Sequence, residues 1–110
     1  MNRQFLPVVK AGVLWLCVGL VSGCGNKEAE TGSLLYQQNC KVCHAQGING
    51  APIVGRSVAW EKRLVQGEDV LVQHAMEGYG LMPAKGGNSE LSEPEVRLVV
   101  RYMMSQSGKE

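Results

Sequence analysis

The hydrophobic and polar positions divide the chain into an apolar beginning and a mixed remainder. Residues 11–20 read AGVLWLCVGL without a charged residue, and the chain beyond residue 26 mixes apolar and polar residues. In the remainder, apolar residues recur at intervals of three and four positions, and no segment shows the sustained alternation of a β-strand. The pattern predicts an all-α domain behind an apolar N-terminal segment.

The clearest predicted helix lies near the C-terminus. Ser92 and Glu95 have the spacing of a capping box, and Pro94 suits the first helical turn. The apolar residues that follow have the spacing of one helical face: Val96, Val99, Val100 and Met103. A helix with one buried face is therefore expected after Ser92.

Similar spacing predicts three more helices, over residues 33–39, 57–65 and 68–77. Ser57 is expected to cap the second of them. The expected apolar face of the third is formed by Val70, Leu71, His74 and Ala75. Residues 78–91 lack periodicity, and a connection of that length inside a compact domain is usually functional or disordered.

The N-terminal segment has the organisation of a secretory signal. Arg3 and Lys10 precede the apolar run, and small residues follow it. Only 16 uncharged residues separate Lys10 from Lys27, fewer than the roughly 20 apolar residues of a membrane-spanning helix. We therefore expect a cleaved signal over residues 1–23 rather than a transmembrane anchor.

The expected cleavage site, residues 21–24, has the sequence VSGC, which resembles the lipobox of bacterial lipoproteins. The resemblance implies that Cys24 becomes the first mature residue and carries acyl chains that hold the protein on a membrane. A passive thiol near an ordinary cleavage site is the alternative. Residues 24–33 are polar and small, and they are expected to form a flexible tether to a domain spanning residues 34–110.

Composition and charge narrow the classes of function. The formal net charge is +1, and removal of the signal leaves nine basic and ten acidic residues, so nucleic acid is not an expected partner. Aromatic residues make up only 5%, so a domain this small needs another core filler, such as a cofactor. Of four cysteines, Cys17 leaves with the signal and Cys24 is assigned to lipid. Only Cys40 and Cys43 remain, too few for a disulfide scaffold.

Those two cysteines belong to the sequence CKVCH, residues 40–44, which matches the C-x-x-C-H pattern of c-type haem attachment. On a tight helical turn, two thiols at this spacing can reach the two vinyl groups on one edge of a porphyrin. The next residue, His44, can then present its imidazole to the iron. A thioredoxin-like redox pair, half of a zinc site and coincidental cysteines are the alternatives. The first lacks its βαβ setting and the second lacks further ligands at the required spacing. We expect one haem c, bound covalently through Cys40 and Cys43.

A sixth ligand for the iron has to come from elsewhere in the chain. The candidates are His74, Met76, Met82, Met103 and Met104. Met82 is favoured because it lies in the aperiodic loop, where Pro83 directs it toward extended backbone and glycines allow close approach to a flat ligand. The other candidates lie in predicted helices, where Met is more often a core filler. Ligation by His74 and an open sixth position remain alternatives.

These motifs together resemble a known family. The pattern begins with Gly32, Tyr36 and the C-x-x-C-H motif, and it continues with Gly50-Ala51-Pro52 and the MPAKGG segment of residues 82–87. It is similar to the class I monohaem cytochromes c over roughly residues 32–104, and within them to the short bacterial cytochrome c-five type. The resemblance implies a cytochrome c fold, in which about four helices wrap around a single haem and the first and last helices cross.

The resemblance also implies roles for individual residues. Cys40 and Cys43 would form the thioether bonds. His44 and Met82 would bind the iron, and the Pro52 carbonyl would accept a hydrogen bond from the other ring nitrogen of His44. Trp60 and Arg63 resemble positions near the haem propionates, and three positions resemble the contact between first and last helices: Gly32, Tyr36 and Tyr102. Members of the c-five group often carry two extra cysteines after the methionine, and residues 88–91 contain none, so the subgroup stays open.

A six-coordinate haem has no open position for a substrate, so the expected function is one-electron transfer rather than catalysis. The expected donor and acceptor are membrane-bound respiratory complexes, met by a monomeric carrier on the periplasmic side of a bacterial membrane. Lys41 and Lys85 flank the predicted ligands and form either a basic docking rim or two ordinary solvated lysines. Two alternatives remain: a haem-based sensor with a labile sixth ligand, and a thiol–disulfide enzyme with free cysteines.

Overall fold

The computed structural model describes residue 12 and residues 24–108, so the predicted signal lies almost wholly outside the described residues. The described elements are α1 (Cys24–Asn39), α2 (Lys41–His44), η1 (Ile48–Gly50), α3 (Ser57–Leu64), α4 (Glu68–Glu77), η2 (Ala84–Gly87) and α5 (Glu93–Ser107). This part of the chain has no strand, and the all-α prediction is confirmed. No helix within it is long and apolar enough to span a membrane.

Helix α5 organises the core. Its capping box is formed as predicted: the Ser92 N–H donates to the Glu95 carboxylate at 2.9 Å, and the Glu95 N–H donates to the Ser92 side chain. The Ser92 hydroxyl also donates to the Glu95 carboxylate, at 2.7 Å. All four apolar residues predicted for its inner face are buried: Val96, Val99, Val100 and Met103. Two core clusters meet on this face, one containing Tyr36 and Trp60, the other Val72 and Leu91.

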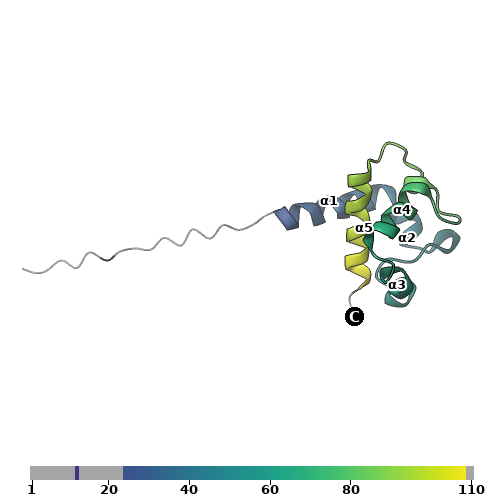
Figure 1. Ribbon diagram of the computed structural model, residues 1–110, viewed down its shortest axis with the longest axis horizontal. Coiled ribbons are helices and arrows are strands. Elements are labelled where there is room, and N and C mark those ends of the chain that lie inside the picture. The colour runs from purple at the N-terminus through teal and green to yellow at the C-terminus, as the bar shows by residue number, and fades with distance from the viewer. Residues whose placement is uncertain (1–11, 13–23, 109–110) are drawn as a thin grey trace, which may run out of the picture.

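Helix α1 crosses α5, and the other helices gather toward the C-terminal end of α1 (Figure 1). Gly32 lies at the crossing, and a Cβ built there would come too close to the Leu98 backbone carbonyl for any real contact. The rings of Tyr36 and Tyr102 pack beside it with their centroids 5.3 Å apart. The helices approach so closely because Gly32 has no side chain.

The expected flexible tether and the expected start of the first helix near residue 33 are both wrong in the structure. Helix α1 begins at Cys24, and its first turns project beyond the other helices (Figure 1). The physical reason lies in the segment KEAE, residues 27–30, because Lys, Glu and Ala have high helix propensity. An ion pair between Glu28 and Arg101, at 3.8 Å, also links this part of α1 to α5.

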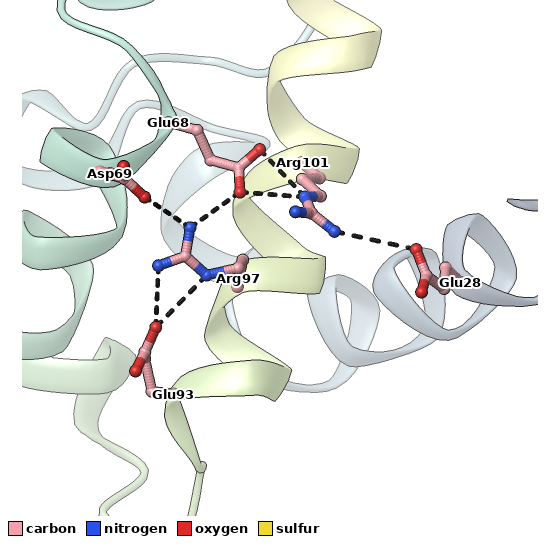
Figure 2. Close-up of polar contacts among 6 residues, drawn as sticks. All are labelled: Glu28, Glu68, Asp69, Glu93, Arg97 and Arg101. Atoms are coloured by element: carbon pink, nitrogen blue, oxygen red, sulfur yellow. Dashed lines mark hydrogen bonds and ion pairs between the residues drawn. The ribbon is translucent and has the colours of Figure 1, made fainter.

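Arg97 and Arg101 bind helices α1, α4 and α5 together through a cluster of ion pairs (Figure 2). Glu68 of α4 accepts from both guanidinium groups, at 2.9 Å in each case. Arg97 also pairs with Asp69 at 2.7 Å and with Glu93 at 2.8 Å. The cluster fixes the start of α4, the helix that precedes the aperiodic loop.

Helices α3 and α4 differ from the predictions in small ways. The bounds of α4 are as predicted, but its buried residue is Val72, whereas Val70 is 37% exposed. Val72 packs with Val96 and Val100 of α5, and Leu71 beside it lines the central cavity. Ser57 is the first residue of α3 rather than its cap, because the Arg56 carbonyl already accepts the first hydrogen bond, from the Ala59 N–H.

Candidate functional site

A cavity of about 730 Å³ opens between α2, the segment from η1 to α3, helix α4 and the loop that follows α4. Its volume lies within the range of about 300–1,000 Å³ that ligand sites usually have. Every predicted site residue lines it: Cys40, Cys43, His44, Pro52, Trp60, Arg63 and Met82. The fold therefore brings together residues that are spread over more than forty positions of sequence.

His44 is buried at the end of α2 and is held through both its side chain and its backbone. Its Nδ1 lies 2.9 Å from the carbonyl oxygen of Pro52, and its own carbonyl accepts a hydrogen bond from the Val54 N–H at 2.9 Å. Burial lowers the pKa of His44, so the ring is neutral at neutral pH. A carbonyl can only accept, so the ring proton is on Nδ1 and the lone pair on Nε2 is left for a metal.

Cys40 and Cys43 lie at the two ends of the first turn of α2, and neither forms a disulfide within residues 24–108. Burial, and then the neighbouring Cys43, raise the pKa of the Cys40 thiol to about 11. A thiol–disulfide enzyme needs the opposite shift, because the thiolate is its nucleophile. The raised pKa argues against a redox pair, and both thiols line the cavity, where they can attach to a bound group.

Met82 reaches the cavity from the loop between α4 and η2. The backbone pairs Met82 with Tyr79 in an isolated antiparallel bridge, with N···O distances of 3.0 and 2.9 Å. Gly78 begins this turn at φ +86°, and a Cβ there would come within 3.0 Å of the Met82 carbonyl oxygen. The aperiodic loop is thus ordered around Met82, which is partly buried and lines the cavity.

The structure separates the other candidates for the sixth ligand. Met76 and Met104 do not line the cavity and pack against the cluster around Val72. Met103 lines the cavity but is also part of the core cluster around Tyr36. His74 lines the cavity too, and its ring is stacked on that of Tyr79.

Trp60 and Arg63 lie on one side of the cavity, on the same helix. The Trp60 ring is buried 6.4 Å from that of His44, and its N–H donates to the Ile53 carbonyl at 3.0 Å. Arg63 uses one of its donors on the Ala59 carbonyl. Among the described residues lining the cavity, Lys62 and Arg63 are the only basic side chains apart from the histidines, and no acidic one is present.

Exposed apolar side chains surround the opening, a feature that the sequence did not indicate. The four that both line the cavity and are exposed are Val42, Ile48, Tyr79 and Leu81. Val42 lies between the two cysteines, and Leu81 directly precedes Met82. Their place next to the predicted haem-binding residues is the sequence feature that could have identified them.

These residues fit a flat, largely apolar group that is held by two thiols and approached by an imidazole and a thioether. They do not fit a metal ion alone, because the described part of the chain contains no cluster of three or more His, Cys, Asp or Glu side chains. The observation that decides the fit is the buried His44, whose Nδ1 is occupied and whose Nε2 is free for an iron.

Comparison with known proteins agrees with this site. Residues 27–103 match the family described as "Cytochrome C oxidase, cbb3-type, subunit III". The chain is 43% identical to cytochrome c-555 of Chlorobaculum tepidum over 84 residues, which cover 73% of this chain and 78% of that protein. It is 32% identical to cytochrome c5 of Ectopseudomonas mendocina over 71 residues, covering 63% of this chain and 82% of the relative.

A solved structure is also similar in fold. It is described as the crystal structure of an electron transfer complex of nitrite reductase with cytochrome c. The matched chain is 40% identical, the match covers 70% of this chain and 94% of that one, and the TM-score is 0.67. The chain therefore belongs to the class I monohaem c-type cytochromes. It carries one haem c, attached through Cys40 and Cys43, and it is a haem-based electron carrier.

Proposed function

We propose that the protein is a membrane-tethered one-electron carrier whose single haem c is six-coordinate, with His44 and Met82 as the iron ligands. The observation that carries this proposal is that Met82 lines the same cavity as His44 and the two cysteines. The bound haem supplies an iron that exchanges one electron between its ferric and ferrous states.

The chain's own residues would set the properties of that iron. The Pro52 carbonyl keeps the His44 ring in one orientation and one tautomer. A Met82 thioether in the sixth position raises the reduction potential relative to a second histidine. The apolar cavity wall, including Trp60 and Met103, excludes water and favours the less charged ferrous state.

The opening of the cavity is the proposed docking surface for a donor and an acceptor. Val42, Tyr79 and Leu81 give it an exposed apolar rim. Lys41 is exposed beside it, whereas the Lys85 ammonium is partly held by the Ser89 carbonyl at 3.2 Å. We expect membrane-bound respiratory complexes with an acidic patch as partners. Electron transfer to native membranes should then slow steeply with ionic strength, and a flat dependence would contradict basic docking.

The membrane attachment would be a lipidated Cys24 on the periplasmic side of a bacterial membrane, after removal of residues 1–23. Helix α1 starts at Cys24 and runs unbroken to Asn39, next to the haem motif. At 1.5 Å per residue, the 16 residues of α1 would hold the haem motif about 24 Å from the lipid end. The attachment is therefore a helical spacer rather than a flexible tether.

Carbon monoxide binding to the reduced holoprotein tests the proposed function. A six-coordinate carrier should bind carbon monoxide slowly or incompletely, because Met82 has to leave first, and it should titrate as a one-electron couple. Rapid, stoichiometric binding would overturn the proposal and support a haem-based sensor with an open sixth position.

A further inference from the structure

We infer that Tyr79, through its stacking on His74, is the positioning residue that holds Met82 in the cavity. This inference rests on the proposed function, in which Met82 is the sixth ligand. Tyr79 and His74 both lie outside the haem attachment motif. Tyr79 contacts Met82 through backbone hydrogen bonds, and His74 makes no hydrogen bond with it.

The stack joins the loop to a fixed helix. The rings of His74 and Tyr79 have centroids 4.1 Å apart and planes inclined by 21°. His74 lies in α4, two positions after Val72, which is 3% exposed in the core. The start of α4 is held by the Glu68 ion pairs with α5 (Figure 2). Tyr79 is therefore anchored on a helix that the rest of the domain keeps in place.

The position of Met82 follows from that of Tyr79. The two residues exchange both backbone hydrogen bonds, and only Gly80 and Leu81 lie between them. A tight turn of this kind moves as a unit, because a shift of one end relative to the other would break both hydrogen bonds. A displacement of the Tyr79 ring from His74 would therefore displace Met82 as well.

Tyr79 lines the cavity but belongs to neither core cluster, so packing against the core side chains does not explain its position. Its side chain is 63% exposed, and its hydroxyl makes no hydrogen bond with any described residue. The stack on His74 is the ring contact that the structure gives it. Aromatic pairs of this geometry contribute beyond the area they bury.

The far end of the loop has its own attachment. The Asn88 side-chain amide donates to Asn39 at 2.8 Å, and Gly86 packs against the Asn39 carbonyl. Six positions separate Asn88 from Met82, so this contact cannot replace the bridge next to Met82. Without the stack, the segment around Met82 would lose its ring contact with α4 and would be held by the close backbone approach of Gly78 and by the Asn39 contacts.

Four variants of the holoprotein test this inference: Tyr79→Ala, His74→Ala, the double variant and Tyr79→Phe. Three quantities report on Met82: the near-infrared absorption of Met-ligated ferric haem, the rate of carbon monoxide binding to ferrous haem, and hydrogen exchange at the Met82 amide. Loss of the stack should raise the fraction of protein in which Met82 is detached from the iron by about 2- to 12-fold. The rates of carbon monoxide binding and of hydrogen exchange at the Met82 amide should rise with it. Tyr79→Phe keeps the ring and should behave as the wild type.

The double variant should be no more affected than the more severe single variant, because both substitutions remove one shared interaction. Wild-type values of all three quantities in Tyr79→Ala would overturn the inference, as would a Tyr79→Phe variant as impaired as Tyr79→Ala. If the wild type itself lacks the near-infrared band, the proposed Met82 ligation fails. The inference is then decided by amide exchange alone, and an unchanged rate at Met82 in Tyr79→Ala overturns it too.

Discussion

The Nδ1 atom of His44 lies 2.9 Å from the carbonyl oxygen of Pro52, eight positions further along the chain. The same segment binds the His44 backbone, because the Val54 N–H donates to the His44 carbonyl. Neither contact involves the loop that carries Met82. The two sides of the cavity are therefore held by separate interactions, and the Met82 side can be changed while the His44 side stays in place.

Replacing Met82 with leucine should remove the sixth ligand and leave the haem attached. Leucine has nearly the volume of methionine but lacks the sulfur, so the effect on packing should be small. We expect loss of the near-infrared band, rapid carbon monoxide binding and a lower reduction potential. The matched control is Met104→Leu, because Met104 does not line the cavity. A Met82→Leu protein with the wild-type spectrum would show that another residue binds the iron.

Alanine at Gly32 should destabilise the fold by about 1–3 kcal/mol, because its Cβ would press on the Leu98 backbone at the crossing of α1 and α5. The measurement is guanidinium unfolding of the holoprotein. Gly25→Ala is the control in the same helix, since a Cβ at Gly25 meets no atom within 4 Å. Equal stability of the two variants would contradict the close crossing.

Replacing Glu68 with glutamine should lower the unfolding free energy at neutral pH, because it removes the ion pairs with Arg97 and Arg101. The loss should be only about 0.5–1 kcal/mol, because these pairs are partly exposed to solvent. Hydrogen bonding to Arg101, and further contact with Arg97, hold the pKa of Glu68 below its usual range. A depressed folded-state pKa gives stability that is present above the ordinary carboxyl pKa and is lost as pH falls through the folded value. The difference between wild type and Glu68→Gln should therefore shrink below about pH 4.

The control for that series is Glu61→Gln, because Glu61 is exposed and forms no ion pair with any residue of the described chain. Urea unfolding from neutral to acid pH gives the comparison. A difference between Glu68→Gln and wild type that stays constant down to strongly acid pH would show that the charge of Glu68 is not what stabilises the domain.

Serine at Cys24 should release the protein from the membrane fraction, if acylation of that residue is the attachment. The haem spectrum should not change, because the cavity lies at the other end of α1. Cys17→Ser is the matched control, since it alters a thiol of the segment expected to be cleaved. Membrane association that survives Cys24→Ser, or that Cys17→Ser abolishes, would argue for an uncleaved anchor.

Features that depend on residues close together in the sequence were predicted better than contacts between separate parts of the fold. The Ser92–Glu95 capping box and the bounds of α4 are local, so sequence spacing was sufficient. The seven site residues that line the cavity were identified from a sequence motif and a family resemblance, not from spacing alone. The stack of Tyr79 on His74 could not be predicted, because it depends on where the loop returns to α4.

The start of α1 was missed for a related reason. Residues 24–33 contain no apolar stripe, and the spacing rule relies on one. Their helix is instead continuous with residues 33–39, which pack on α5, so it extends a helix that already exists. Propensity in the KEAE segment was present in the sequence, but small polar residues on either side favoured the interpretation as a linker.

The optical spectrum of the purified holoprotein, oxidised and reduced, is the sharpest test of the His44/Met82 haem. That ligation predicts a sharp c-type band on reduction, haem that stays with the chain after denaturation, and the weak near-infrared band of a methionine sulfur on ferric iron. A c-type spectrum with high-spin features and no near-infrared band would contradict His44/Met82 ligation.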